Sequence, residues 1–152
     1  MVKRKSTIID LSHPLVLIVE DNDYILNIIT ETLTKKKIRF EVAKNGTCAV
    51  DSFKKKICNE NKLYSLILMD IVMPFKNGFE ATQEIREFEI QENIERTFIC
   101  GMSSDKNNDL EKKCIAAGMD DFVVKPITPL SLSNLIEKGK ERYSSQLLLS
   151  IQ

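Results

Sequence analysis

Residue types that build metal centres or disulfide frameworks are scarce in this chain of 152 residues. There is one histidine, His13, no tryptophan, and only five glycines and four prolines. The four cysteines form no CxxC pair and lie far along the chain from His13: Cys48, Cys58, Cys100 and Cys114. This spacing argues against a zinc site or a disulfide framework, and favours thiols in a reducing compartment, the cytoplasm.

Long apolar runs and an excess of one charge are also missing. No apolar run reaches the roughly 18 residues that a membrane span needs, and no cleavable apolar segment follows Lys3, Arg4 and Lys5. Lys+Arg and Asp+Glu number 22 each, so no global positive field attracts nucleic acid or an anionic membrane. We expect one soluble domain with a substantial core, no membrane insertion and no direct nucleic-acid binding.

The sequence does contain a regular alternation of β-rich apolar runs with segments of helical periodicity. The run LVLIV at 15–19 is apolar throughout, and Ile25, Ile28, Ile29 and Leu33 then recur at helical spacing. A helix follows each of five predicted strands, which are 15–19, 38–43, 63–70, 97–102 and 121–124. Strands that are apolar on both faces indicate an α/β fold with a parallel sheet covered by helices on both sides.

Local signals set the expected limits of the domain. Thr128 is expected to cap the last helix, with Pro129 at its first position. Residues 1–13 lack periodicity and are expected to form a flexible leader. Residues 14–143 are expected to form the domain, and 144–152 either extend the last helix or form a tail.

Polar residues gather where the predicted strands end, which is the edge at which parallel sheets bind ligands. These residues are Glu20, Asp21, Asp70, Ser103, Ser104 and Lys125. Clustered carboxylates repel one another unless a cation lies among them, and an all-oxygen set favours a hard ion such as Mg²⁺. A carboxylate beside such an ion can take up a phosphoryl group as a nucleophile, so Asp70 is the predicted phosphoacceptor.

Four segments, in this order, resemble the receiver domain of response regulators in two-component phosphorelays. They are LVLIVEDN (15–22), LILMDIVMPFKNGFEAT (66–82), FICGMSS (98–104) and AAGMDDFVVKPI (116–127). The motifs MDIVMP and GMDDF are similar to those of hybrid-kinase receivers, including eukaryotic ones. If the protein is eukaryotic, the nucleus is the alternative to the expected cytoplasmic location. The resemblance implies a (βα)5 doubly wound, flavodoxin-like sheet of five parallel strands in the order 2-1-3-4-5.

The resemblance also implies the chemistry of the site. Asp70 would accept a phosphoryl group from a phosphohistidine. Magnesium would be held by Glu20, Asp21, Asp70 and the backbone carbonyl of Val72. A histidine kinase or a histidine-containing phosphotransfer protein would be the donor, and a downstream protein would read the result.

Further residues would bind the phosphoryl group and transmit its presence. Lys125 and the hydroxyl of Ser103 would contact it, with Ser104 as the alternative register for the hydroxyl. A cis peptide bond would precede Pro126. Phe122 occupies the aromatic switch position, and after phosphorylation the ring and the hydroxyl would turn inward and shift the face of the fourth helix, fifth strand and fifth helix.

Three positions depart from the commonest pattern of the family. Glu20 stands in place of an aspartate, and its longer side chain still supplies a carboxylate. Phe122 replaces tyrosine and therefore lacks the phenol. Val72 is apolar and cannot orient a hydrolytic water, so we expect the phosphoryl group to be long-lived or passed onward.

The expected docking site of the phosphodonor is the first helix. Its residues Tyr24, Ile25 and Ile28 offer an apolar face beside the predicted site. This helix must also supply core residues, so its sequence alone does not separate the exposed positions from the buried ones.

Two functions of other classes are alternatives to that of a signalling receiver. A phosphatase or mutase with an aspartyl nucleophile would carry DxDx(T/V), but Val72 stands where its second aspartate belongs. A phosphorylation-independent pseudo-receiver would lack Asp70, Lys125 or the acidic pair, and all are present. We therefore expect a receiver and not an enzyme acting on external substrates, either alone or as a part of a hybrid histidine kinase.

Overall fold

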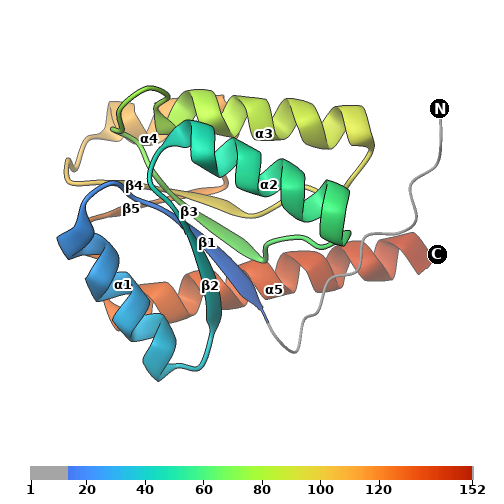
Figure 1. The fold of residues 1–152 in the computed structure, drawn as a ribbon, viewed down its shortest axis with the longest axis horizontal. Coiled ribbons are helices and arrows are strands. Elements are labelled where there is room, and N and C mark those ends of the chain that lie inside the picture. The colour runs from blue at the N-terminus through green and yellow to red at the C-terminus, as the bar shows by residue number, and fades with distance from the viewer. Residues whose placement is uncertain (1–13, 152) are drawn as a thin grey trace.

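The computed structural model describes residues 14–151 as five strands alternating with five helices (Figure 1). In chain order these are β1 (Leu15–Val19), α1 (Asp23–Lys35), β2 (Arg39–Ala43), α2 (Gly46–Glu60), β3 (Leu66–Asp70), α3 (Gly78–Glu92), β4 (Ile99–Ser103), α4 (Asn108–Ala117), β5 (Asp121–Val124) and α5 (Pro129–Ile151). The predicted leader, 1–13, lies outside the described residues. The helix α5 continues through most of the segment 144–152 that was predicted as a tail or an extension.

The strands form one parallel sheet in the order β2-β1-β3-β4-β5. The register places Val16 of β1 beside Leu66 of β3, and Cys100 of β4 beside Asp121 of β5. Helices α1 and α5 cover one face of the sheet, and α2, α3 and α4 cover the other (Figure 1). The predicted doubly wound α/β fold and its strand order are confirmed.

Two apolar clusters hold the sheet between its helices. Alternate side chains of a strand point to opposite faces, so Leu17 belongs to one cluster with Phe53 of α2, and Val16 belongs to the other with Leu33 of α1. Every residue of β3 is buried. Complete burial of one large aliphatic side chain contributes about 1.5–3 kcal/mol to stability. The buried side chains of β3 therefore hold the position of Asp70 at its end.

The strand predicted at 63–70 begins only at Leu66. Its neighbour β1 begins at Leu15, and the preceding Pro14 has no N–H with which to extend the pairing. Ser65 instead uses both its backbone N–H and its hydroxyl to donate to the carbonyl oxygen of Leu15, at 2.9 and 3.1 Å.

The strand predicted at 97–102 begins at Ile99, because buried side chains bind the backbone of Thr97. The Thr97 N–H donates to the carboxylate of Glu89 at 2.8 Å, and the Thr97 carbonyl accepts from Arg86 at 2.8 Å. Side chains of α3 thus take the place of a strand neighbour at Thr97.

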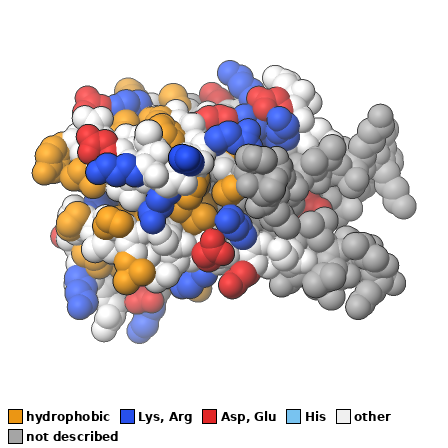
Figure 2. All heavy atoms as spheres, turned by 90° about the horizontal axis from the view of Figure 1, so that it is seen from below, with side chains coloured by type: hydrophobic (Ala, Val, Ile, Leu, Met, Phe, Trp, Pro, Cys, Tyr) orange, Lys and Arg blue, Asp and Glu red, His pale blue; other side chains and the backbone are white. Residues whose placement is uncertain are grey.

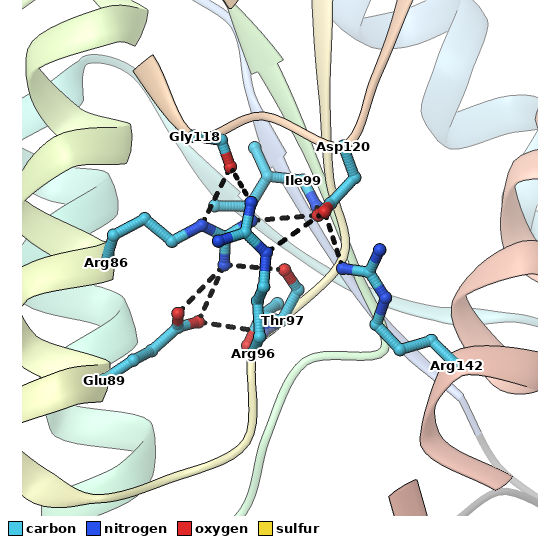
Figure 3. Close-up of polar contacts among 8 residues, drawn as sticks. All are labelled: Arg86, Glu89, Arg96, Thr97, Ile99, Gly118, Asp120 and Arg142. Carbon is cyan, nitrogen blue, oxygen red and sulfur yellow. Dashed lines mark hydrogen bonds and ion pairs between the residues drawn. The ribbon is translucent and has the colours of Figure 1, made fainter. Parts of the chain in front are cut away.

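Asp120 is the centre of a polar network at the same, amino-terminal edge of the sheet (Figure 3). Its carboxylate pairs with Arg86 at 2.9 Å, with Arg96 at 3.2 Å and with Arg142 at 2.7 Å, and accepts from the Ile99 N–H at 2.9 Å. The three arginines come from α3, the α3–β4 connection and α5. The network therefore joins these elements to the beginnings of β4 and β5.

Polar caps begin the helices. At the starts of α1 to α4, an asparagine side chain accepts a hydrogen bond from a backbone N–H of the first turn. These asparagines are Asn22, Asn45, Asn77 and Asn107. The hydroxyl of Thr128 accepts a backbone hydrogen bond at 3.1 Å in the first turn of α5, as predicted. Within residues 14–151, none of the helices combines the length and the apolar character that crossing a membrane requires.

Candidate functional site

An acidic pocket opens at the carboxyl edge of the sheet. Its volume is about 220 Å³. Its lining includes Glu20, Asp21, Asp70, Val72, Ser103 and Lys125. Because β1, β3, β4 and β5 are successive neighbours in the sheet, their ends bring together residues that are far apart in the sequence. The structure thus places the predicted metal ligands and the predicted phosphoryl-binding residues in one pocket.

Lys125 lies between two buried carboxylates. Its Nζ is 2.6 Å from Oε2 of Glu20 and 3.0 Å from Oδ1 of Asp70. Glu20 is fully buried, and Asp70 is 4% exposed. Burial opposes the charged ammonium, but the hydrogen bonds that it donates to both carboxylates hold the pKa of Lys125 above its ordinary value. One ammonium between two carboxylates leaves an excess of negative charge when both are ionised.

The excess negative charge makes Asp70 harder to ionise. Burial, followed by the charge of Glu20, raises the pKa of Asp70 to about 6, although Lys125 acts in the opposite direction. A carboxylate whose ionisation is this costly gains from a further cation. The pocket therefore carries a group that is both buried and poised to bind positive charge.

The donor set of the pocket fits magnesium. Carboxylate oxygens of Glu20, Asp21 and Asp70 lie within 4.8 Å of one another. Mg²⁺ prefers a few carboxylates together with water and phosphate oxygens. Asp21 is exposed, and Val72 is among the residues that line the same pocket.

The two serines after the fourth predicted strand differ in burial. Ser103 is the last residue of β4 and is 5% exposed, whereas Ser104 is exposed. The hydroxyl oxygen of Ser103 accepts a hydrogen bond from the Asp105 N–H at 3.1 Å. Both serines line the acidic pocket, and only Ser103 is buried there.

Phe122 is not among the residues that line this pocket. It lies in β5, is half-buried, and packs against the apolar cluster that contains Met119. The register pairs it with Gly101 of β4. The peptide bond between Lys125 and Pro126 is cis, the geometry that the resemblance implies. Lys125 lines the pocket directly, whereas Phe122 lies on the strand that leads to it.

Two residues outside the predicted set of site residues also shape the pocket. The Asn22 N–H donates to Oε1 of Glu20 at 3.1 Å, so the cap of α1 also orients this carboxylate. A Cβ at Gly78 would lie 2.3 Å from the carbonyl oxygen of Asp70, so only glycine lets α3 begin this close to the end of β3. An asparagine directly before a helical pattern was the available signal for Asn22.

Comparison with known proteins identifies this arrangement. The family model of the response regulator receiver domain matches residues 16–137. The chain belongs to this family. The receiver is 34% identical over 131 residues to the peroxide stress-activated histidine kinase mak1 of Schizosaccharomyces pombe, covering 86% of this chain. The match covers only 8% of that kinase, so the receiver spans a small part of this curated relative.

Solved structures agree with this assignment. One is the co-crystal structure of the Saccharomyces cerevisiae histidine phosphotransfer signalling protein Ypd1 and the receiver domain of its downstream response regulator Ssk1. It matches with a TM-score of 0.75 and 32% identity, over 84% of this chain and 89% of that one. The receiver domain of sensor histidine kinase PA1611 from Pseudomonas aeruginosa, with magnesium coordinated in its active site cleft, has a TM-score of 0.71 and 27% identity over 85% and 98% of the chains.

Proposed function

We propose that this chain is the phosphoaccepting receiver of a histidine-to-aspartate phosphorelay, with Asp70 as the phosphoacceptor. The observation that carries the proposal is the position of Lys125, with Nζ 3.0 Å from the buried Asp70 carboxylate in a pocket shared with Glu20 and Asp21. Such a pocket combines a nucleophile, a cation that can meet phosphoryl charge and carboxylates that can hold a metal ion.

Glu20, Asp21 and Asp70 would hold Mg²⁺, with the backbone carbonyl of Val72 as a further ligand. The ion would offset the negative charge that raises the pKa of Asp70, and would stabilise charge on the phosphoryl oxygens. The magnesium ion in the cleft of the PA1611 receiver supports this assignment.

Phosphoryl transfer in this pocket uses Asp70 as the nucleophile. An oxygen of its carboxylate forms a bond to phosphorus while the phosphorus–nitrogen bond of the donor's phosphohistidine breaks. The imidazole nitrogen leaves with the electron pair and is protonated by water. Lys125 and the hydroxyl of Ser103 donate hydrogen bonds to the phosphoryl oxygens and stabilise their charge. Ionised Asp70 is the reactive form, and in the metal-free pocket it predominates above a pH of about 6.

The response to phosphorylation would pass through the edge of the sheet. Ser103 of β4 is the register partner of Val124, and Phe122 lies two residues before this partner on β5. A phosphoryl group that draws the Ser103 hydroxyl inward would favour the packing in which the Phe122 ring also turns inward. The face formed by α4, β5 and α5 would then shift its population toward the form that a downstream protein binds.

The apolar side chain of Val72 favours a long-lived phosphoryl group. It lines the acidic pocket and has no polar atom that could orient an attacking water. The phosphoryl group would then be transferred or retained, which suits a member of a relay.

A histidine-containing phosphotransfer protein or a histidine kinase would dock on α1. A hollow of about 440 Å³ lies between this helix and the loop after β5, and its apolar lining includes Tyr24, Ile25, Ile28, Pro126 and Ile127. Figure 2 views the face formed by α1 and α5, and hydrophobic side chains gather at the end where α1 begins. The complex of Ypd1 with the Ssk1 receiver supports a partner of this class.

Intact-mass measurement after incubation with Mg²⁺ and acetyl phosphate tests the proposed chemistry. The wild type should gain one phosphoryl group, and Asp70→Asn should gain none. Asp51→Asn, which removes an exposed aspartate of α2, is the matched control and should behave as the wild type. A phosphoryl group on Asp70→Asn would contradict the proposal. So would a folded wild type that binds Mg²⁺ but accepts a phosphoryl group from neither acetyl phosphate nor a phosphohistidine protein.

A further inference from the structure

The loop that leaves β3 after the phosphoacceptor contains an unusual turn. The Lys76 N–H donates to the carbonyl oxygen of Pro74 at 2.9 Å, which closes a three-residue γ-turn around Phe75. Phe75 has a φ of 69°. A γ-turn whose central residue has positive φ is rare and strained, and a bulky side chain makes this conformation more costly.

The ring of Phe75 contributes nothing to the core. At 91% exposed, it is the most exposed large hydrophobic residue among those that the structure describes. A glycine or an asparagine would adopt this backbone at a lower cost and would not present an apolar ring to water. Folding therefore gives no reason for phenylalanine here, and a strained exposed residue of this kind indicates a role in function.

The turn is held firmly by its surroundings. The Gly78 N–H donates to the Ile71 carbonyl at 2.9 Å, which closes the loop at its base. Lys76 forms an ion pair with Glu84 of α3. A Cβ at Gly46 would lie 2.4 Å from the Lys76 carbonyl oxygen, so the start of α2 packs directly against the turn. An aromatic ring on a rigid turn loses little conformational freedom when a partner covers it.

The loop lies on the side of the acidic pocket opposite α1. It leads into α3, and α1 and α3 cover opposite faces of the sheet (Figure 1). Val72, three residues before Phe75, is 76% exposed and lines the acidic pocket. Three residues of chain span at most about 11 Å, so Phe75 is confined to the neighbourhood of the mouth. On the far side of the mouth, Tyr24 of α1 is also 76% exposed.

We propose that Phe75, together with Val72, is a second docking arm for the protein that donates the phosphoryl group, a histidine-containing phosphotransfer protein. This inference rests on the proposed function. Asp70 is only 4% exposed, so a protein donor must press its histidine into the pocket and bring its own surface against the rim. An apolar donor surface around that histidine would cover Phe75 on one side and the apolar face of α1 on the other.

The test compares a protein donor with a small one. The rate of phosphoryl transfer from phosphorylated Ypd1 is divided by the rate of modification by acetyl phosphate, for each variant. Phe75→Gly removes the ring and relieves the positive φ, so the fold should be kept. The ratio should fall about tenfold, the usual loss for one anchor residue of an interface. Phe75→Tyr should keep the wild-type ratio.

Ile90→Ala is the matched control. Ile90 is 80% exposed and lies near the carboxyl end of α3, away from the mouth of the pocket. Its ratio should equal that of the wild type. An unchanged ratio in Phe75→Gly, an equal fall in Ile90→Ala, or a wild type that accepts from acetyl phosphate but not from Ypd1 would overturn the docking arm. Failure of the wild type with both donors would instead contradict the proposed function, and this inference with it.

Discussion

At the scale of single residues, the acidic pocket is governed by the balance around Lys125. Its ammonium pairs with Glu20 and Asp70, and burial together with Glu20 raises the pKa of Asp70 from 3.8 to about 6. The folded protein therefore holds this proton more tightly than the unfolded chain. The stability that protonated Asp70 contributes is fully present below a pH of about 4 and is lost as the pH rises through about 6.

Asp70→Asn should accordingly stabilise the metal-free protein at neutral pH. The substitution leaves Lys125 and Glu20 as a balanced pair, so the unfolding temperature in EDTA should exceed that of the wild type at pH 7.5. The difference should shrink when the pH is lowered to 4.5, because wild-type Asp70 is then largely protonated. Thermal unfolding followed by circular dichroism measures both values. A difference that is independent of pH, or one that Asp51→Asn reproduces, would contradict this account.

The cysteines offer a second prediction at this scale. Cys48 and Cys58 are exposed, whereas Cys100 and Cys114 are buried. Burial raises the pKa of Cys114 to about 11 and raises that of Cys100 further. Because the thiolate is the reactive form, a thiol reagent should modify two cysteines rapidly in the native protein and all four in denaturant. Peptide mass mapping that finds Cys100 or Cys114 among the rapidly modified residues would show that the core is not packed as described.

At the scale of elements, the Asp120 network fixes the positions of α3 and α5 against the sheet. The Asp120 side chain is 5% exposed and serves three arginines as well as the Ile99 N–H. Arg142 also lies over the ring of Phe98, with Cζ 4.9 Å from the ring centroid. Removal of the Asp120 carboxylate would leave uncompensated positive charge on its partners, above all on Arg86, whose side chain is 10% exposed.

Asp120→Ala should therefore lower the free energy of unfolding by about 3–5 kcal/mol, the usual loss when one partner of a buried ion pair is removed. Asp121→Ala is the control, because its pair with Lys138 joins side chains that are 30% and 55% exposed. That pair should contribute at most about 1 kcal/mol. Urea unfolding of both variants measures the two values. Equal losses of unfolding free energy would mean that the Asp120 network contributes no more to stability than the exposed pair of Asp121 with Lys138.

The sequence was informative where an element is fixed by its own residues. The apolar runs of β1 and β3 predicted buried parallel strands, and their ends placed Glu20 and Asp70 at one edge. Two strands begin two or three residues later than predicted. The sequence could not show this, because these starts depend on contacts such as that of Glu89 with Thr97 across a loop. The sequence placed Glu20 and Lys125 at the same edge but did not predict their direct ion pair, because that pair depends on side-chain positions at the ends of two strands far apart in the chain.

At the scale of the whole molecule, the two edges of the sheet have different characters. The amino-terminal edge is closed by the Asp120 network, and the carboxyl edge is an open pocket with surplus negative charge. In the proposed function, a phosphoryl group bound at the open edge would act on β4 and β5, which carry Ser103 and Phe122. The closed edge gives α3 and α5 a fixed base against which such a change can occur.

Phosphorylation should therefore perturb one side of the molecule. In two-dimensional amide NMR spectra with Mg²⁺, addition of acetyl phosphate should shift the resonances of the acidic pocket and of α4, β5 and the start of α5. Amides of α2 and of the amino-terminal end of β1 should change little. Shifts confined to the loop after Asp70 would contradict a switch through Ser103 and Phe122. Asp70→Asn, treated in the same way, should show no such shifts.

Identification of the modified residue after transfer from a phosphohistidine tests the central claim most directly. Phosphorylated Ypd1 is incubated with the chain and Mg²⁺, the product is reduced with borohydride, and the peptides are sequenced by mass spectrometry. Reduction converts an aspartyl phosphate to homoserine, and we expect homoserine at position 70 alone. Homoserine at another position, or an acid-stable phosphate on a serine or threonine, would contradict it.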